Sequence, residues 1–254
     1  MRNPLLAADE PSAVTEKRRD GRSDFVILVD HASRRIPKSL NNLGLPEGEL
    51  SRHIAWDIGA LAVAERVSEA LDATLVAQSY SRLVIDCNRE PSVPSAIPPV
   101  SEVTAVPGNE NLSDGQREAR TQAVHAPYHD HIAALLDERA RQGRNTILIA
   151  QHTMTPVFKG SARGMQSAVM YNRDGRFALA LQEALTNGAG AIVADNQPYA
   201  MTDATDYTLP IHGEKRGLLH VGLEIRQDLV EDEAGQLLWA DRVAKALEKA
   251  RSRF

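Results

Sequence analysis

The sequence has a single cysteine, Cys87, among its 254 residues. One cysteine can form neither an intramolecular disulfide nor a cysteine-rich zinc site, which is typical of a protein from a reducing compartment. The sequence also has no block of Lys and Arg residues interleaved with aromatic residues. Aromatic residues make up only 4% of the chain, and its net charge is -5. This composition argues against a nucleic-acid-binding protein. Because there is only one cysteine, any metal ion must bind to His, Asp or Glu.

Long hydrophobic runs are also missing. No stretch approaches the roughly 18 apolar residues that a membrane helix needs. The first 23 residues contain only a four-residue apolar run before Asp9 and Glu10, which is too short for the core of a signal peptide. We expect residues 1–23 to form a polar arm and the protein to be cytoplasmic, with no membrane segment and no oligomeric state indicated. Residues 24–254 are enough for one large hydrophobic core, so we predict a single domain there.

Short apolar runs alternate with amphipathic segments along the chain. Strands are predicted at residues 25–29, 74–78, 82–87, 145–152, 167–171, 191–194 and 218–227. Helices are predicted at residues 46–71, 113–142 and 176–187 and at the C-terminal end, with a break or kink at Pro127. Between these elements, residues 90–112 and 195–217 read as long irregular loops, of the kind that often border a site. The alternation predicts an α/β fold, a mostly parallel or mixed twisted sheet flanked by helices.

Four of the predicted strands finish in polar residues. "FVILVDHASRRIP" runs into His31, and "NTILIAQH" repeats this pattern at His152. "SRLVIDCNR" ends in Asn88 and Arg89, and the last strand carries Glu224. In open α/β sheets, ligand sites lie outside the carboxyl ends of the strands. Each histidine alone is more often structural, but together these residues favour a shared site.

The residue types at these strand ends suit metal-assisted hydrolysis. Two histidines with one carboxylate form a recurrent catalytic zinc site whose fourth position holds water. Zinc lowers the pKa of that water to about 7, and Glu224 could accept and return its proton. Asn88 and Arg89 could bind a substrate carboxylate. The alternative is that Asn88 and Arg89 only cap the strand and pair with a surface acid.

Five motifs, in the same order, resemble the N-formylglutamate amidohydrolase family: "DHASRRIP", "AWDIGA", "SRLVIDCNR", "QHTMTP" and "LEIRQDL". The resemblance covers residues 24 to 250. It implies a fold similar to the zinc carboxypeptidases and the aspartoacylase group. It also implies hydrolysis of a small N-acyl acidic amino acid, with N-formyl-L-glutamate giving formate and glutamate in histidine degradation. By this resemblance His31 and His152 bind the metal, Asn88 and Arg89 hold a substrate carboxylate, and Glu224 is the general base.

The third metal ligand departs from the carboxypeptidase pattern. That pattern has a glutamate three residues after the first histidine, where this sequence has Arg34. We take Asp57 as the ligand, because it lies on the apolar stripe of the predicted helix 46–71, where an acid needs a partner. His53 is the competitor, because residues four apart on a helix lie on the same face and His53 is four residues before Asp57. Zinc is the expected metal, although manganese, iron or cobalt also bind such residues.

A glutamate substrate carries two carboxylates, so a second arginine is expected. Arg226 is one candidate, because side chains two apart on a strand share a face and Glu224 is two residues before it. Arg82 is another, but its odd spacing from Arg89 would place the two on opposite faces of a regular strand. His212, in the second long loop, is a weaker candidate for the pocket.

Other reactive residues have simpler explanations. His125, His129 and His131 lie close together but without an acid, and we interpret them as packing or pocket-rim residues. Cys87 reads as a small buried residue. Two rival functions remain open: a zinc hydrolase for a different acidic amide or small peptide, and a ligand-binding relative without catalysis.

Overall fold

The computed structural model describes residues 5–254, and within them seven strands form one mixed sheet in the order β1-β3-β2-β6-β11-β9-β10. The strands are β1 (Val14–Lys17), β2 (Phe25–Val29), β3 (Thr74–Gln78), β6 (Ile147–Met154), β9 (Ser167–Met170), β10 (Val193–Asp195) and β11 (Leu219–Arg226). Strands β3, β2, β6 and β11 are parallel, whereas β1 is antiparallel to β3 and β9 to β11. The predicted single domain with a mixed sheet is confirmed.

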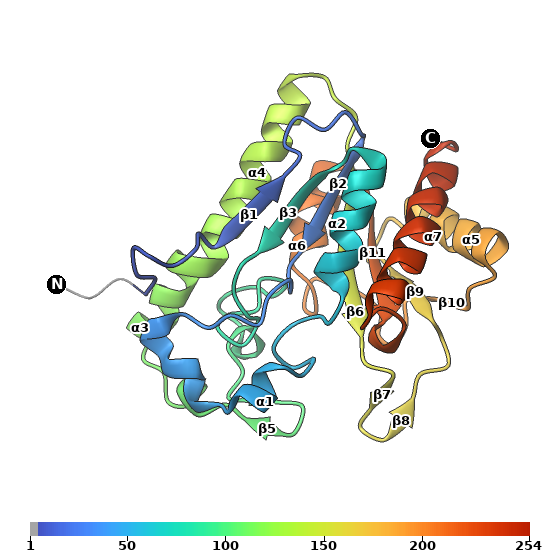
Figure 1. Cartoon of the computed structure of the whole chain (residues 1–254). Coiled ribbons are helices and arrows are strands. Elements are labelled where there is room, and N and C mark those ends of the chain that lie inside the picture. The colour runs from blue at the N-terminus through green and yellow to red at the C-terminus, as the bar shows by residue number, and fades with distance from the viewer. Residues whose placement is uncertain (1–4) are drawn as a thin grey trace.

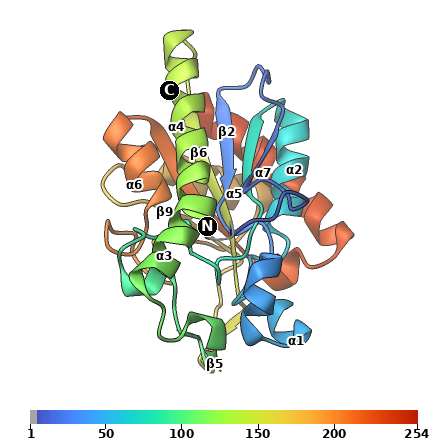
Figure 2. The same ribbon diagram turned by 90° about the vertical axis from the view of Figure 1, so that its left-hand side faces the viewer.

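Helices cover both faces of this sheet (Figures 1 and 2). One face carries α2 (Ala60–Leu71), α5 (Arg176–Ala189) and α7 (Glu233–Arg251), and the other carries α3 (Asp114–Arg120), α4 (Ala126–Arg141) and α6 (Thr208–His212). The smaller elements are α1 (Glu47–Leu50), β4 (Val100–Ser101), β5 (Thr104–Ala105), β7 (Val157–Phe158) and β8 (Ser161–Ala162). Short 3₁₀ turns lie at Lys38–Gly44, Pro94–Ala96, Pro107–Asn109, Glu214–Arg216 and Gln227–Leu229. No described helix is both long and apolar enough to cross a membrane.

The central strand β2 shows why its sequence is a continuous apolar run. Phe25, Ile27 and Val29 belong to the core under α2, α5 and α7, and Val26 and Leu28 to the core under α3, α4 and α6. All five side chains are buried. A parallel strand covered on both faces therefore has no polar alternation.

The N-terminal arm contributes a strand that the sequence analysis does not predict. Val14–Lys17 forms the edge strand β1, paired with β3 from Gln78 to Leu75. Residues 1–4 of the predicted arm lie outside the described residues.

The predicted helix 46–71 is wrong in its middle. Helix α1 ends at Leu50 and α2 begins at Ala60, with turns between them. Gly59, just before α2, has φ of 81°, and a Cβ there would lie 2.4 Å from the carbonyl oxygen of Val230. An α-helix cannot continue through such a residue. Asp57 therefore lies in a turn, and the expected shared helix face with His53 does not exist.

The predicted strand 82–87 is also wrong, because this segment forms turns. The Ser81 side-chain oxygen accepts a hydrogen bond from the Leu83 N–H at 3.1 Å, and the Ser81 carbonyl accepts one from the Val84 N–H at 2.9 Å. Leu83, Val84 and Ile85 are nevertheless fully buried. Their apolar character reflects burial rather than a strand, so the strand-face objection to Arg82 no longer applies.

The long predicted helix 113–142 is present with a local change of winding. The Gln116 side chain accepts a hydrogen bond from the Ser113 N–H at 2.9 Å, which completes a capping box at the start of this helix. A π-helical turn at Thr121–His125 joins α3 to α4, and Pro127 then lies in the first turn of α4. A missing N–H is tolerated in that position, so the helix is not broken.

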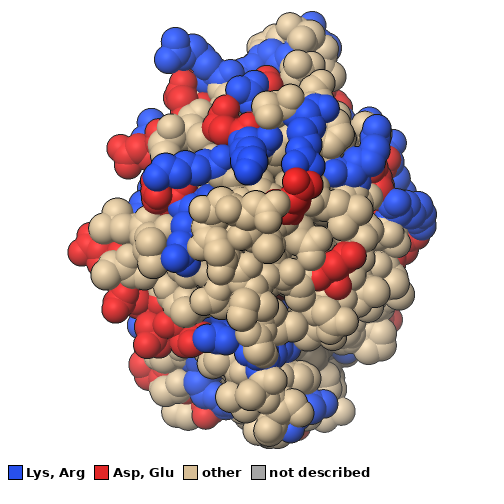
Figure 3. Space-filling model, turned by 90° about the vertical axis from the view of Figure 1, so that its right-hand side faces the viewer, with Lys and Arg blue, Asp and Glu red and all other residues tan. Residues whose placement is uncertain are grey.

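The face over α5 and α7 is shown in Figure 3. Lys and Arg side chains, with Asp and Glu among them, gather toward the top of this view, and a broad area below them has few charged side chains. Helices α5 and α7 expose Leu179, Leu237 and Leu238 to solvent. Charge of one sign does not dominate this face.

Candidate active site

The register of the sheet brings the predicted strand-end residues to one edge. Glu224 of β11 lies level with His152 of β6. Strand β2 lies on the other side of β6 and ends at Val29, so Asp30 and His31 leave the sheet beside His152. The polar residues gather at the carboxyl ends of adjacent parallel strands, where ligand sites of α/β sheets lie.

Three buried side chains converge there and define the candidate metal group: His31, Asp57 and His152. The Asp57 Oδ2 lies 2.9 Å from the His152 Nδ1 and 3.4 Å from the His31 Nδ1. Each residue offers one ligand atom, and these atoms all lie within 4.8 Å of one another. This group can hold a metal ion. The competitor His53 is not a member of this group, and its Nε2 lies 3.5 Å from Glu102.

Local hydrogen bonds explain how Asp57 reaches this place from a turn. The Asp57 N–H donates to the His31 carbonyl at 2.9 Å. The Ser81 hydroxyl donates to the Ala55 carbonyl at 2.7 Å, and the Thr153 hydroxyl donates to the Ile58 carbonyl at 2.9 Å. The turn is thus bonded to the ends of three other segments.

The outer nitrogens of the two histidines also contact carboxylates. The His31 Nε2 lies 2.7 Å from the Asp86 Oδ1, and the His152 Nε2 lies 3.4 Å from the Asp30 Oδ2. Histidines that bind metals usually contact a carboxylate or carbonyl through the second nitrogen, which fixes the ring. The sequence analysis missed both acids, although Asp30 precedes His31 directly and Asp86 belongs to "SRLVIDCNR".

The charge of this cluster suits a divalent cation. Asp30, Asp57 and Asp86 are buried, and Arg82 contacts the last two at 3.5 and 2.7 Å. With neutral histidines, three carboxylates and one guanidinium leave an excess of two negative charges, which is costly in a buried place. Burial works to lower the pKa of the two histidines of the group, but the surrounding carboxylates raise it overall. A divalent cation would supply the same two charges as two protons.

Glu224 lies beside this group with one unused oxygen. Its Oε2 is buried and has no hydrogen-bond partner among the described residues. Burial raises the pKa of Glu224 to about 7, the charge of His152 opposes this, and Asp57 adds to it. A carboxyl group with a pKa near neutrality can both accept and donate a proton.

One hollow adjoins the candidate metal group at Asp57, and a second hollow adjoins the first. The first, of about 380 Å³, is lined by Asp57 and Glu224 together with Tyr199. The second, of about 280 Å³, has an apolar wall that includes Leu83 and Pro98. Both hollows share the residues His53, Arg82, Arg89 and Phe158.

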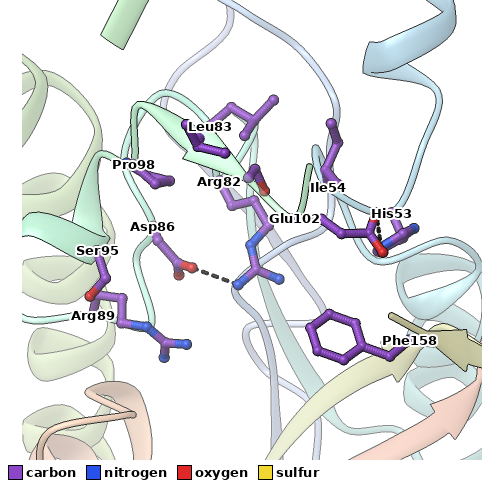
Figure 4. Close-up of a pocket in the computed structure, with 12 residues that line it drawn as sticks. His53, Ile54, Arg82, Leu83, Asp86, Arg89, Ser95, Pro98, Glu102 and Phe158 are labelled. Atoms are coloured by element: carbon purple, nitrogen blue, oxygen red, sulfur yellow. Dashed lines mark hydrogen bonds and ion pairs between the residues drawn. The ribbon is translucent and has the colours of Figure 1, made fainter. Parts of the chain in front are cut away.

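Figure 4 shows the two shared arginines. The guanidinium of Arg82 is directed to Asp86, whereas that of Arg89 extends into the hollow. Among residues 5–254, Arg89 donates hydrogen bonds only to backbone carbonyls, those of Asn88 and Thr205. Arg89 therefore keeps a positive charge available to a ligand.

The other three predicted substrate-binding residues do not line either hollow. Asn88 donates to the Asp206 carboxylate at 2.8 Å, and its Oδ1 accepts hydrogen bonds from the Tyr207 and Thr208 N–H groups. Arg226 pairs with Asp228. His212 is not a solvated loop residue but is buried in α6.

A second group of buried histidines, His125, His129 and His212, lies on the α4 and α6 side of the sheet. The His129 Nε2 lies 2.8 Å from the Cys87 carbonyl, and its Nδ1 lies 3.0 Å from the His212 Nε2. The His125 Nε2 lies 3.0 Å from the Arg89 carbonyl. Burial lowers the pKa of His129 to about 3 and that of His212 to about 4. This group is neutral and packs against the loop that carries Asp86 and Arg89.

Comparisons with known proteins agree with the fold. The model of the family "N-formylglutamate amidohydrolase" matches residues 23–231. No curated protein matches the sequence. The crystal structure of a gene product from Agrobacterium tumefaciens is similar, with a TM-score of 0.95 and 39% identity over 98% of each chain. An N-formylglutamate amidohydrolase from Ralstonia eutropha JMP134 shares the fold, with a TM-score of 0.68 and 18% identity over 95% of this chain and 98% of that one.

Proposed function

The chain belongs to the N-formylglutamate amidohydrolase family, and from this premise we propose that it hydrolyses the amide bond of a small N-acyl acidic amino acid, such as N-formyl-L-glutamate. The products would be formate and glutamate. We further propose a cytoplasmic enzyme of histidine degradation. The observation that carries the proposal is the convergence of His31, Asp57 and His152 beside Glu224.

The proposed cofactor is one zinc ion held by His31, Asp57 and His152. A zinc ion there would lower the pKa of a water molecule and polarise the amide carbonyl. Asp86 and Asp30 hold the two histidine rings through their outer nitrogens, and each ring therefore presents its Nδ1 to the centre. Manganese, iron or cobalt would suit the same residues.

Glu224 is the proposed general base and acid. Glu224 lines the hollow that also contains Asp57, so its carboxylate can accept a proton from the attacking water. It would then donate this proton to the departing amine as the carbon–nitrogen bond breaks. The raised pKa of Glu224 supports both steps.

The arginines divide the remaining tasks. Arg89 has no acidic partner among the described residues, so it is the proposed anchor for a substrate carboxylate. Arg82 is engaged by Asp57 and Asp86, and its proposed role is to hold these acids and to stabilise negative charge that develops nearby.

The test is hydrolysis of N-formyl-L-glutamate by zinc-loaded protein, measured as release of formate and glutamate. Glu224→Gln should retain bound zinc and lower kcat by about 10²- to 10⁴-fold, because only the proton-transfer group changes. Lys159→Gln, an exposed change on the β7–β8 hairpin, is the matched control. Turnover of Glu224→Gln close to that of the unchanged protein would remove Glu224 from the mechanism.

The second hollow favours one alternative, a longer acidic amide or small peptide as substrate. This hollow, of about 280 Å³, shares Arg89 and Phe158 with the first hollow, so a larger acyl group could extend into it. A panel of N-acyl glutamates with acyl groups of increasing length separates the two. Tight binding without hydrolysis of any of them would instead identify a ligand-binding relative.

A further inference from the structure

Arg163 follows the β7–β8 hairpin and lines the same hollow as Glu224 and Arg89. We infer that Arg163 binds the second carboxylate of a dicarboxylate substrate, while Arg89 binds the other. Arg163 is then the residue that makes the site prefer acidic N-acyl amino acids with two carboxylates. This inference rests on the proposed function, since it concerns the substrate of the same site.

The charge of Arg163 is available to a ligand. Within residues 5–254, no carboxylate lies at ion-pair distance from its guanidinium, which donates to the Thr155 carbonyl at 3.0 Å. The guanidinium also lies over the Phe158 ring, 5.3 Å from its centroid. Backbone and aromatic contacts of this kind orient an arginine without neutralising it. Arg82, by contrast, already contacts two carboxylates.

The backbone of Arg163 is fixed by Arg226. The Arg226 Nη1 donates to the Arg163 carbonyl at 3.0 Å and to the Met165 carbonyl at 3.3 Å. Asp228 holds the same guanidinium from the other side, at 2.8 Å. Arg226, which the sequence analysis placed in the substrate pocket, therefore acts as a positioning residue for Arg163. The Arg163 N–H in turn donates to the Pro156 carbonyl at 2.8 Å and closes the base of the hairpin.

Two guanidinium groups without an ion-pair partner favour a ligand with two carboxylates. Arg89 and Arg163 line one hollow, and neither forms an ion pair with a described residue. A ligand with one carboxylate leaves one guanidinium partly desolvated and without an anion, which is unfavourable. A ligand with two carboxylates satisfies both with charge-assisted hydrogen bonds.

The kinetic test compares N-formyl-L-glutamate with two analogues that each lack one carboxylate, N-formyl-L-glutamine and N-formyl-4-aminobutyrate. The unchanged protein should hydrolyse both analogues with lower kcat/KM than N-formyl-L-glutamate. Arg163→Gln should raise KM for N-formyl-L-glutamate by about 10- to 100-fold with little change in kcat, because it removes a charged hydrogen-bond donor that binds substrate. In this variant one of the two analogues should become as good a substrate as N-formyl-L-glutamate.

Two further variants distinguish recognition from folding. Arg226→Gln should raise KM in the same direction by a smaller factor, since it loosens the Arg163 backbone and leaves its charge in place. Lys245→Gln, which changes an exposed cation on α7, should leave all three substrates unaffected. If both analogues stay as poor relative to N-formyl-L-glutamate in Arg163→Gln as in the unchanged protein, the inference is wrong.

A binding measurement separates failure of this inference from failure of the proposed function. Calorimetric titration of zinc-loaded protein with L-glutamate does not depend on hydrolysis. The unchanged protein should bind L-glutamate about 10- to 100-fold more tightly than Arg163→Gln does. Equal affinities, or no binding to the unchanged protein, would overturn the role of Arg163 even if N-formyl-L-glutamate is hydrolysed.

Discussion

Two groups of buried histidines lie on either side of Asp30, and they differ in their partners. His31 and His152 contact carboxylates through both ring nitrogens. His129 and His212 contact a backbone carbonyl and each other. Asp30 lies between the groups, with its Oδ1 accepting hydrogen bonds from Tyr128 and Thr208 and its Oδ2 near His152.

The pKa of a buried histidine therefore shifts in opposite directions in the two groups. Carboxylates raise the pKa of His31 and His152 against the effect of burial. Burial lowers the pKa of His129 and His212 because no carboxylate compensates it sufficiently. A buried histidine thus indicates a cation site only where acids surround it. This difference identifies the first group as the candidate metal site and the second as packing.

The largest expected effect is a loss of zinc affinity when a carboxylate that contacts a histidine of the first group is removed. Asp86→Asn replaces the carboxylate 2.7 Å from the His31 Nε2 with an amide, which holds the ring less strongly. We expect zinc affinity to fall by about 10- to 100-fold, measured by competition with a chelator. Asp203→Asn, an exposed change, is the control. Unchanged zinc affinity in Asp86→Asn would remove the distinction between the two groups.

Acid should destabilise the protein through the second group. The pKa values of His129 and His212, about 3 and about 4, lie below the ordinary value of 6.5, so the unfolded chain binds protons first as the pH falls. The stability that these two histidines contribute should therefore be full above pH 6.5 and decrease toward pH 4, by about 1.4 kcal/mol per pH unit for each histidine. Urea unfolding of zinc-free Glu224→Gln protein from pH 6.5 to pH 5 measures this slope. The substitution is needed because Glu224, with a pKa raised to about 7, takes up a proton in the folded state over this range and opposes the effect.

A smaller expected effect isolates the contribution of His212 to the pH dependence of the unfolding free energy. His212→Asn removes one of the two titrating groups, so the decrease in unfolding free energy between pH 6.5 and pH 5 should be smaller by about 1.4 kcal/mol per pH unit. A slope identical to that of the unchanged protein would mean that His212 binds its proton in the folded state as readily as in the unfolded chain.

The sequence predicts those parts of the site that follow from strand ends. Buried parallel strands read as continuous apolar runs, so the ends of β2 and β6 are visible, and with them His31 and His152. Glu224 follows from the same pattern in β11. The helix face that predicts Asp57 does not exist, and Asp57 reaches the site through a turn fixed by Gly59.

The rest of the site depends on contacts between distant segments. Asp86 lies in a buried turn whose apolar residues resemble a strand, so spacing rules misplace its neighbours Arg82 and Arg89. Arg226 is predicted in the pocket, but Arg163 lines the hollow and Arg226 donates a hydrogen bond to its backbone. This arrangement depends on the base of a hairpin that has only two-residue strands. Such short pairings have too little sequence pattern to be predicted.

The most direct test of the central claim is the zinc content of matched histidine variants. Protein dialysed against zinc and then freed of excess ion should retain one equivalent, measured by mass spectrometry of the metal. His129→Ala, from the second group, should retain the same amount, whereas His152→Ala should lose nearly all of it. Unchanged zinc in a folded His152→Ala protein would contradict the assignment of His31, Asp57 and His152 as the metal site.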